Sequence, residues 1–235
     1  MTSDNIPNIV RDYAPILHFH PEEGEYCCFP SDAEEIYSKY FNSWDSFEKQ
    51  LTPRNLDTST PCYYEMWTSE RMTQLRYWFW YNYNRFPRAP LGLGEHLGDW
   101  EHVEVRIYTE NKVIWLFSNH LVSRLLSIPE GLTLPKFKAV TPMLDKMHVH
   151  AWVALGSHAL YPSHDSKPYC IGGVLCDKIS ADGEVWKTID NLVDLSATNF
   201  YEFQGRWGDS GAPRSPTNEY NNRWRNASNT GPITG

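Results

Sequence analysis

The sequence predicts a mainly β fold, a β-sandwich with a few short helices and long loops. The chain of 235 residues holds 10 Trp, 14 Tyr and 10 Phe, and aromatic side chains are typical of strands. Several segments alternate between apolar and polar residues with the period of two that a half-buried strand requires. No long helical periodicity appears, and sandwiches of this length fold around one core. We therefore expect a single domain over residues 1–235.

The first quarter of the chain predicts a strand followed by a helix. Residues 13–30 alternate as a strand, pass through a charged turn and continue as a short extended piece. A helix is expected over roughly 33–41, where Ser31 can cap it and Glu34 completes a capping box. Residues 42–62 are expected to form a loop.

The middle of the chain predicts the central strands. Residues 75–84 are apolar on both faces, as a central strand would be. A loop rich in proline and glycine leads from there into a strand that carries two carboxylates, described below. Residues 112–120 are the expected hairpin partner of that strand, joined to it through Thr109–Asn111.

The second half of the chain is less regular. Residues 121–147 form a candidate lid or insertion, because long irregular segments inside a domain are often functional. A strand is expected over 148–159, a long loop over 161–184 and a short helix near 187–195. The tail from Gly205 is expected to pack across the sandwich.

The carboxylate strand is the most informative segment. Its alternation puts Asp99 and Glu101 on the same face as Val103, Val105 and Ile107. That apolar face is expected to be buried, and an unpaired buried carboxylate costs several kcal/mol or more. A divalent cation would neutralise the two acids. The alternatives are a strand frame shifted by one residue, or an arginine that supplies the opposite charge.

Two further residues could join this metal site. His96 comes from the preceding glycine-rich turn and could bind the ion directly or through water. Asn84 could offer an amide oxygen, although a turn-starting role is an alternative for it. Because carboxylates favour hard cations, we expect Mg²⁺ or Ca²⁺.

Three histidines are candidates for moving protons. His158 ends the predicted strand over 148–159, His120 ends the strand over 112–120, and His102 lies on the carboxylate strand. Each could instead be a hydrogen-bonded structural residue. His148 and His150 are expected to be peripheral.

Composition excludes some classes of partner and leaves the compartment as an expectation. The formal net charge of −8 argues against nucleic acid as a partner. No apolar stretch is long enough to span a bilayer, and no secretory signal is visible, so we expect a cytoplasmic or otherwise intracellular protein. Cys170 and Cys176 could close a loop, but free thiols are the simpler interpretation.

Four blocks of sequence, taken in order, resemble the vacuolar protein sorting sixty-two-like family. These blocks are Tyr13–Leu17 with Phe29–Asp32, Gly94–Glu101, Gly156–Pro162 and Gly205–Gly208. Together they span nearly the whole chain. The biochemical activity of that family is mostly undefined, and its name reflects a trafficking phenotype.

A more distant similarity is to the necrosis-inducing (NLP) cytolysins. Their heptapeptide Gly-His-Arg-His-Asp-Trp-Glu shares its spacing with His96, Asp99, Trp100 and Glu101, although Gly98 replaces its second histidine. The resemblance implies a β-sandwich that holds a divalent cation near these residues. By position, it implies that His158 matches a later histidine of the family.

Three functions are consistent with these patterns. The first is a metal-assisted enzyme, a hydrolase, lyase or cyclase/isomerase, acting on a small organic substrate, for instance in specialised metabolism. The second is a cation-dependent module that binds a glycan or a lipid headgroup. The third is a trafficking or interaction protein with a structural ion.

Overall fold

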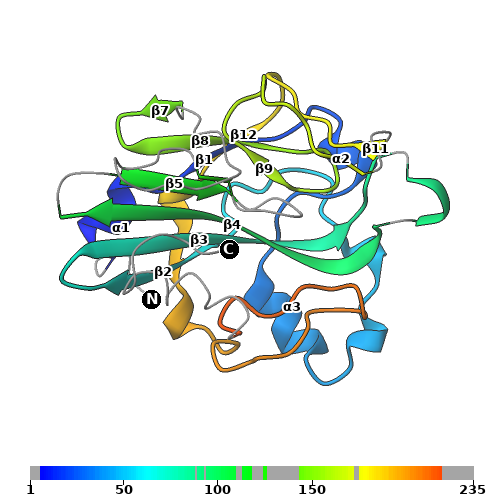
Figure 1. The fold of residues 1–235 in the computed structure, drawn as a ribbon. Coiled ribbons are helices and arrows are strands. Elements are labelled where there is room, and N and C mark those ends of the chain that lie inside the picture. The colour runs from blue at the N-terminus through cyan, green and yellow to red at the C-terminus, as the bar shows by residue number, and fades with distance from the viewer. Residues whose placement is uncertain are drawn as a thin grey trace.

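The computed structural model describes residues 6–87, 89–92, 94–109, 113–117, 124–125, 143–171 and 175–218. In this part of the chain the protein is mainly β, with two larger sheets and a few short helices (Figure 1). The predicted fold class is confirmed. Two of the candidate regions, His120 and most of the expected lid over 121–147, lie outside the described residues.

The smaller of the two sheets has the strand order β12-β1-β8-β7, with β9 paired to β8. Its strands are β1 (Ile16–His18), β7 (Leu144–Asp145), β8 (His148–Val153), β9 (Leu160–Tyr161) and β12 (Val185–Lys187). Strands β1 and β8 run parallel, whereas β1 pairs antiparallel with β12. Segments from both ends of the chain therefore meet in one sheet.

The larger sheet has the strand order β13-β2-β3-β4-β5-β6. Its strands are β2 (Cys62–Thr68), β3 (Met72–Asn84), β4 (His96–Tyr108), β5 (Val113–Phe117), β6 (Arg124–Leu125) and β13 (Leu192–Asp194). The long antiparallel pair of β3 and β4 runs from Met72↔Tyr108 to Asn84↔His96 and crosses the middle of the molecule (Figure 1). This pair carries most of the residues that matter below.

Short helices and the hairpin of β10 (Cys170–Ile171) and β11 (Leu175–Cys176) complete the described fold. The helices are α1 (Asn8–Asp12), α2 (Glu23–Tyr26) and α3 (Ala33–Tyr40), with short 3₁₀ turns at Trp44–Ser46, Lys49–Leu51, Pro90–Gly92, Thr188–Asn191 and Leu195–Ala197. Helix α3 begins at Ala33, as predicted, but its cap lies one residue later than predicted. Asp32, rather than Ser31, accepts hydrogen bonds from the backbone amides of Glu34 and Glu35.

The main core lies between the two sheets. Val103 and Val105 of β4 are fully buried there, together with Leu17 of β1 and Trp186 of β12. The alternation of β4 therefore points Asp99, Glu101 and the valines toward the smaller sheet, as the sequence predicts. The frame does not slip, because β3 and β4 stay in one register along their whole pairing.

A second, aromatic cluster covers the opposite face of the larger sheet. Trp80 and Trp100 are paired across β3 and β4 and pack against Trp207 and Phe200. Helix α3 and the segment after residue 195 lie on this side of the sheet (Figure 1). The described part of the tail therefore packs on the outer face of the larger sheet.

Three elements differ from the sequence-based expectation. Strand β2 was not predicted, and it begins at the last residue of the expected loop over 42–62. The expected loop over 161–184 contains a hairpin of β10 (Cys170–Ile171) and β11 (Leu175–Cys176). The expected helix near 187–195 is instead a 3₁₀ turn between β12 and β13. The residues on either side of the turn form strands, because β12 pairs with β1 of the smaller sheet and β13 pairs with β2 of the larger sheet.

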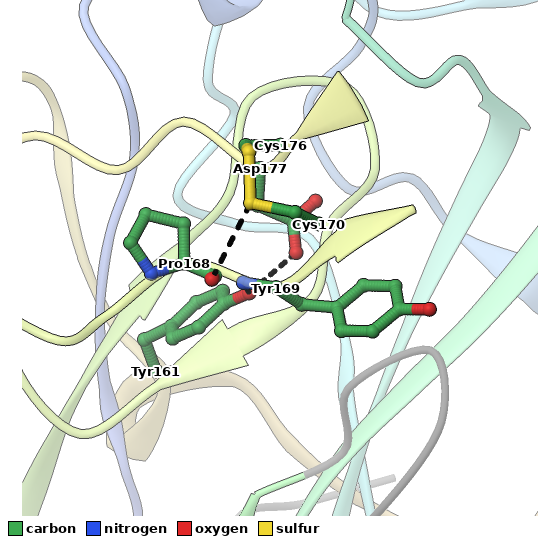
Figure 2. The surroundings of a disulfide bond; sticks show 6 residues. All are labelled: Tyr161, Pro168, Tyr169, Cys170, Cys176 and Asp177. Atoms are coloured by element: carbon green, nitrogen blue, oxygen red, sulfur yellow. Dashed lines mark hydrogen bonds between the residues drawn. A yellow bond between two sulfur atoms is a disulfide. The ribbon is translucent and has the colours of Figure 1, made fainter. Parts of the chain in front are cut away.

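Cys170 and Cys176 form a disulfide, so the expectation of free thiols is wrong for this pair (Figure 2). They face each other in the antiparallel register of β10 and β11, which brings the two sulfur atoms together. Cys27, Cys28 and Cys62 are free and buried. Within the described residues, no helix is long and apolar enough to cross a bilayer.

Candidate functional site

The candidate site is centred on His158, which lies in the tight turn between β8 and β9. The turn is closed by hydrogen bonds from the Ala154 amide to the Ala159 carbonyl and from the His158 amide to the Ala154 carbonyl. His158 has a φ of +54° and a fully buried side chain. A left-handed backbone is costly for a residue other than glycine, and such strain is concentrated at functional sites.

One edge of the His158 ring is fixed by Asp99. The Nδ1 atom lies 3.0 Å from the Asp99 Oδ2 atom. The ring also stacks on Tyr81, which pairs with Asp99 across β3 and β4, with 3.8 Å between centroids and 5° between planes. Burial lowers the pKa of His158, but hydrogen bonds with Asp99, Cys27 and Glu23 outweigh it and raise that pKa well above 6.5.

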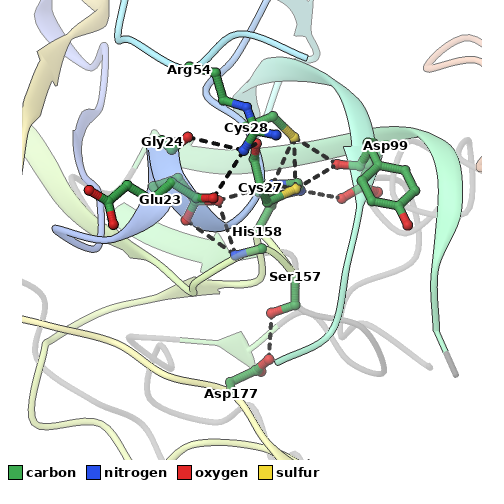
Figure 3. A network of polar contacts seen from close by, with 12 residues as sticks. Glu23, Gly24, Cys27, Cys28, Arg54, Asp99, Ser157, His158 and Asp177 are labelled. Atoms are coloured by element: carbon green, nitrogen blue, oxygen red, sulfur yellow. Dashed lines mark hydrogen bonds and ion pairs between the residues drawn. The ribbon is translucent and has the colours of Figure 1, made fainter. Parts of the chain in front are cut away.

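The other edge of the ring faces three groups at similar distances. The Nε2 atom of His158 lies 3.7 Å from a Glu23 carboxylate oxygen, 3.8 Å from the Cys27 sulfur and 3.7 Å from the Cys28 sulfur (Figure 3). Glu23 is fully buried, and both of its carboxylate oxygens accept a hydrogen bond from the Gly156 amide. An imidazole, a carboxylate and two thiols therefore converge inside the protein.

The two thiols are tightly paired. Their sulfur atoms are 2.9 Å apart, and both thiols donate to the backbone carbonyl of Tyr83. Burial raises the pKa of Cys27, but hydrogen bonds with Cys28 and His158 overcome this and bring that pKa to about 7. Burial and the neighbouring Cys27 raise the pKa of Cys28. One of the two sulfurs is thus the preferred place for a thiolate.

Helix α2 holds Glu23 and the two cysteines in place. Arg54 donates to the carbonyls of Gly24, Glu25 and Cys27, where the short helix leaves backbone acceptors unpaired. A Cβ atom on Gly24 would lie 2.0 Å from the Arg54 carbonyl oxygen. Only glycine allows this close approach of the two loops.

An aromatic and charged rim adjoins the buried cluster. We define the rim as Tyr26, Tyr83, Arg85 and Glu95. The Arg85 guanidinium lies over the Tyr26 ring at 4.8 Å and pairs with Glu95 at 3.4 Å, and the Tyr83 hydroxyl donates to Glu95 over 2.6 Å. The side chains of Arg85 and Glu95 are 47% and 30% exposed.

The rim is joined to the His158 turn through the backbone. The Arg85 amide donates to the Gly156 carbonyl over 2.7 Å, and a Cβ atom on Gly156 would lie 2.7 Å from the Tyr26 ring. Tyr26 also precedes Cys27 directly, and the Tyr83 carbonyl receives both thiol hydrogen bonds. The surface and the buried cluster therefore form one continuous region.

The structure brings together only part of the predicted site. Asp99 and His158 meet, and Glu101 lies on the same face of β4 and is 5% exposed. Asp99, Glu101 and Glu23 all raise the pKa of Tyr81 in addition to the larger effect of burial. The Tyr81 hydroxyl is buried, and no partner for it is found in the described part of the chain.

His96 and Asn84 are not members of this site. They pair with each other across β3 and β4, and alternation puts them on the face opposite Asp99 and Glu101. His96 bonds to the Gly98 carbonyl, and the Asn84 amide donates to the Gly94 carbonyl. That His96, Asp99 and Glu101 hold one ion stays a prediction. Among the described residues, the His, Cys, Asp and Glu side chains whose ligand atoms gather in a group of three or more are Cys27, Cys28 and His158.

His102 is also remote from His158. It lies on the outer face of β4 and packs on Trp78, with 4.4 Å between ring centroids. Glu23, Cys27 and Cys28 were not predicted as site residues. The run Pro21–Glu25 has the composition of a solvated turn, and only the vicinal cysteines could have signalled a site.

A separate cavity of about 200 Å³ lies at the opposite end of β8 from His158. It is lined by residues that include Ile16, His148 and Thr188. Its lining includes no residue of the cluster around His158.

No known protein family matches the chain, and no curated protein sequence does. The resemblance to the vacuolar protein sorting sixty-two-like family is therefore unsupported. The solved structures that are similar to this chain include necrosis- and ethylene-inducing protein 2 from the causal agent of cocoa's witches' broom disease. That protein is 14% identical, with a TM-score of 0.44 over 83% of this chain and 80% of the other.

Two other similar structures are of NLPPya. Its complex with mannosamine is 12% identical, with a TM-score of 0.46 over 84% of this chain and 83% of the other. Its complex with glucosamine is 13% identical, with a TM-score of 0.43 over 84% of this chain and 77% of the other. These are NLP proteins, and the His96–Glu101 motif resembles the motif of the same family. Similarity at this level does not carry an activity or a ligand over to this chain.

Proposed function

We propose that this protein is a cation-dependent module that binds a glycan on the rim formed by Tyr26, Tyr83, Arg85 and Glu95. The observation that carries the proposal is the direct junction between this half-exposed rim and the buried cluster of His158, Asp99 and Glu23. A cation in the cluster would hold the His158 turn, and through the Gly156–Arg85 hydrogen bond it would fix the rim.

The chemistry of the rim suits a sugar. A few fixed polar groups can orient the hydroxyls of a sugar ring. Arg85 and Glu95 offer a donor and an acceptor side by side, and the Tyr26 ring lies under the arginine. The net charge of −8 disfavours anionic headgroups, which makes a glycan a better ligand than an anionic lipid.

The nature of the cation is part of the proposal. Mg²⁺ and Ca²⁺ remain predictions from the sequence, because they were inferred from the two carboxylates of Asp99 and Glu101. The buried cluster has two sulfur atoms and one nitrogen among its nearest groups.

The test is binding of saccharides to the full chain with and without a chelator. Glucosamine and mannosamine, which NLPPya binds in its solved complexes, serve as first probes, followed by a broader glycan array. We expect binding that falls when the metal is removed. Arg85→Ala should weaken binding by about tenfold, which corresponds to about 1.4 kcal/mol.

The matched control is Lys39→Ala, which removes an exposed cation whose partner, Glu35, lies on the same helix α3. This variant should bind sugars like the parent protein. The proposal fails if no saccharide binds, or if the Arg85 and Lys39 variants bind equally well.

A metal-assisted enzyme is the second candidate, and one alignment favours it. The His158 ring lies between Asp99 and Cys27. Its Nδ1 atom is 3.0 Å from the Asp99 carboxylate, and its Nε2 atom is 3.8 Å from the Cys27 sulfur. Such an arrangement can activate a thiol. Both thiols are at most 3% exposed, so a substrate would have to open the site. Turnover of a small compound that is lost in folded Cys27→Ser would favour this function.

A further inference from the structure

We propose that the cluster is a thiolate metal site for a zinc-class divalent cation, held by Cys27, Cys28 and His158. This inference rests on the proposed function in one respect: it names the cation on which that function depends. It differs from the oxygen-ligand site that the sequence predicts, because its nearest donors are sulfur and nitrogen.

The distances between the donors fit one ion. Zinc lies about 2.3 Å from sulfur and about 2.0 Å from imidazole nitrogen, so a tetrahedral site separates the two donors by about 3.6 Å. The His158 Nε2 atom lies 3.7 Å and 3.8 Å from the two sulfurs. The sulfurs, now 2.9 Å apart, would separate to about 3.8 Å on sharing an ion.

The imidazole is already oriented as a metal ligand. Metal-binding histidines usually donate their second ring nitrogen to a carboxylate, which fixes the ring and raises its basicity. Asp99 takes this position on Nδ1, at 3.0 Å. The stacking on Tyr81 prevents the ring from rotating, so the Nε2 lone pair is aimed at the two sulfurs (Figure 3).

Glu23 lies next to the three donors but is not one of them. Its carboxylate is fully buried, it lies 3.7 Å from the same nitrogen, and the Gly156 amide holds it in position. A buried carboxylate needs a compensating charge. Two thiolate donors and one neutral imidazole suit a divalent ion.

The donor set also selects the type of metal. Thiolate and imidazole ligands favour zinc-class ions, whereas magnesium and calcium require oxygen. When the ion binds, each thiol forms a sulfur–metal bond and the His158 Nε2 atom forms a nitrogen–metal bond; the protons on these atoms are released to solvent, and no oxidant or reductant is needed. Asp99 acts on the site through His158 and does not contact the ion.

The first test uses the unaltered full chain, stripped with a chelator and titrated with Co²⁺ and then Zn²⁺. We expect one Co²⁺ per chain with a sulfur-to-cobalt charge-transfer band, displacement by Zn²⁺, and no displacement by excess Mg²⁺ or Ca²⁺. X-ray absorption of the zinc form should show sulfur neighbours at about 2.3 Å. Only nitrogen and oxygen neighbours in that spectrum would overturn the proposal.

Variants identify the ligands. Cys27→Ser and Cys28→Ser should each weaken the charge-transfer band to about half and the double variant should lose it, while Cys62→Ser, another free and buried cysteine, should retain it. Asp99→Asn should keep the band but bind the metal about 10–100-fold more weakly. A band that persists without Cys27 and Cys28, or disappears without Cys62, contradicts the assignment.

The sugar-binding experiment separates this inference from the proposed function. If zinc is bound through sulfur but no saccharide binds, the metal site stands and the glycan function fails. If saccharides bind in the presence of Mg²⁺ or Ca²⁺ and no sulfur ligation is found, the function stands and the zinc site fails.

Discussion

At the scale of the residue, two histidines have their pKa values shifted in opposite directions, because burial lowers both pKa values and only His158 has neighbours that outweigh it. His158 has a raised pKa because Asp99 and Glu23 lie beside its ring. His18 on β1 is only partly buried, yet its pKa is lowered to about 4 by burial and by the nearby His150 and His164. Its Nε2 atom lies 2.6 Å from the Nδ1 atom of His150, which leaves no room for a proton on both.

This pair predicts a loss of stability in acid. Because the folded state lowers the pKa of His18, the unfolded chain takes up a proton more readily as the pH falls below 6.5. Between pH 7 and pH 5 the free energy of unfolding should fall by about 1 kcal/mol more in the parent than in His18→Gln, a figure reduced for solvent screening of a partly exposed ring. Urea titrations at both pH values measure this. Equal losses in the two proteins would contradict it.

Asp99 and His158 were each predicted from the sequence as site residues, but not as partners of one another. Each was a candidate because of its own surroundings along the chain. Their hydrogen bond joins residues 59 positions apart, and no spacing rule connects them. Glu23 was assigned to a solvated turn, since nothing in its local sequence shows that β8 and β9 bury it.

At the scale of the element, β4 is held by packing on both faces. Its inner face meets the smaller sheet, and its outer face meets the aromatic cluster around Trp207. Gly98 marks the point of closest approach. It has a φ of +74°, and a Cβ atom there would lie 1.8 Å from the Trp207 carbonyl oxygen and 2.6 Å from the Trp80 ring.

We expect Gly98→Ala to be severely destabilising. The methyl group would meet a backbone carbonyl that cannot move without lifting the segment around Trp207, and the left-handed backbone adds to this. The free energy of unfolding should fall by more than about 3 kcal/mol. Denaturant unfolding followed by tryptophan fluorescence measures the change.

Gly94→Ala is the matched control for Gly98→Ala. Gly94 has a similar φ of +80°, but its nearest contact, the Phe86 Cβ atom, is 3.4 Å away. The loss there should be only the backbone cost of about 1 kcal/mol. Equal losses for the two glycines would show that close approach at Gly98 is not the cause.

The elements with the strongest alternation or the longest aromatic run were predicted, whereas β2 was missed although it carries three aromatic residues. Strands β3 and β4 were identified from these patterns. Strand β13 and the β10–β11 hairpin are two or three residues per strand, too short for any period to be recognised. They exist because partner strands are available to pair with them, which is a property of the assembled sheets.

At the scale of the whole molecule, the two sheets pack face to face through large side chains. Trp186 of β12 packs edge-on against Phe79 of β3, with 5.9 Å between ring centroids. Both are fully buried. This contact joins strands of different sheets and is a direct probe of the sandwich.

A double-mutant cycle tests this packing. Trp186→Leu and Phe79→Leu should each destabilise the protein, and their coupling energy should be about 0.5–1.5 kcal/mol, as for other aromatic pairs. Trp186→Leu combined with Trp207→Leu is the control, because Trp207 packs on the opposite face of the larger sheet. That pair should be additive within about 0.5 kcal/mol. Additivity of the first pair would contradict the face-to-face packing.

The sequence by itself determined the β class, the two central strands and the inward face of β4, because these follow from side-chain periodicity along a continuous segment. Tertiary structure alone decided which donors surround His158. The turn after β8 carries the histidine between α2 and β4, and burial then brings two sulfurs and two carboxylates to it. Residues far apart in the chain become neighbours only when the sheets pack, and that packing determined the chemistry of the site.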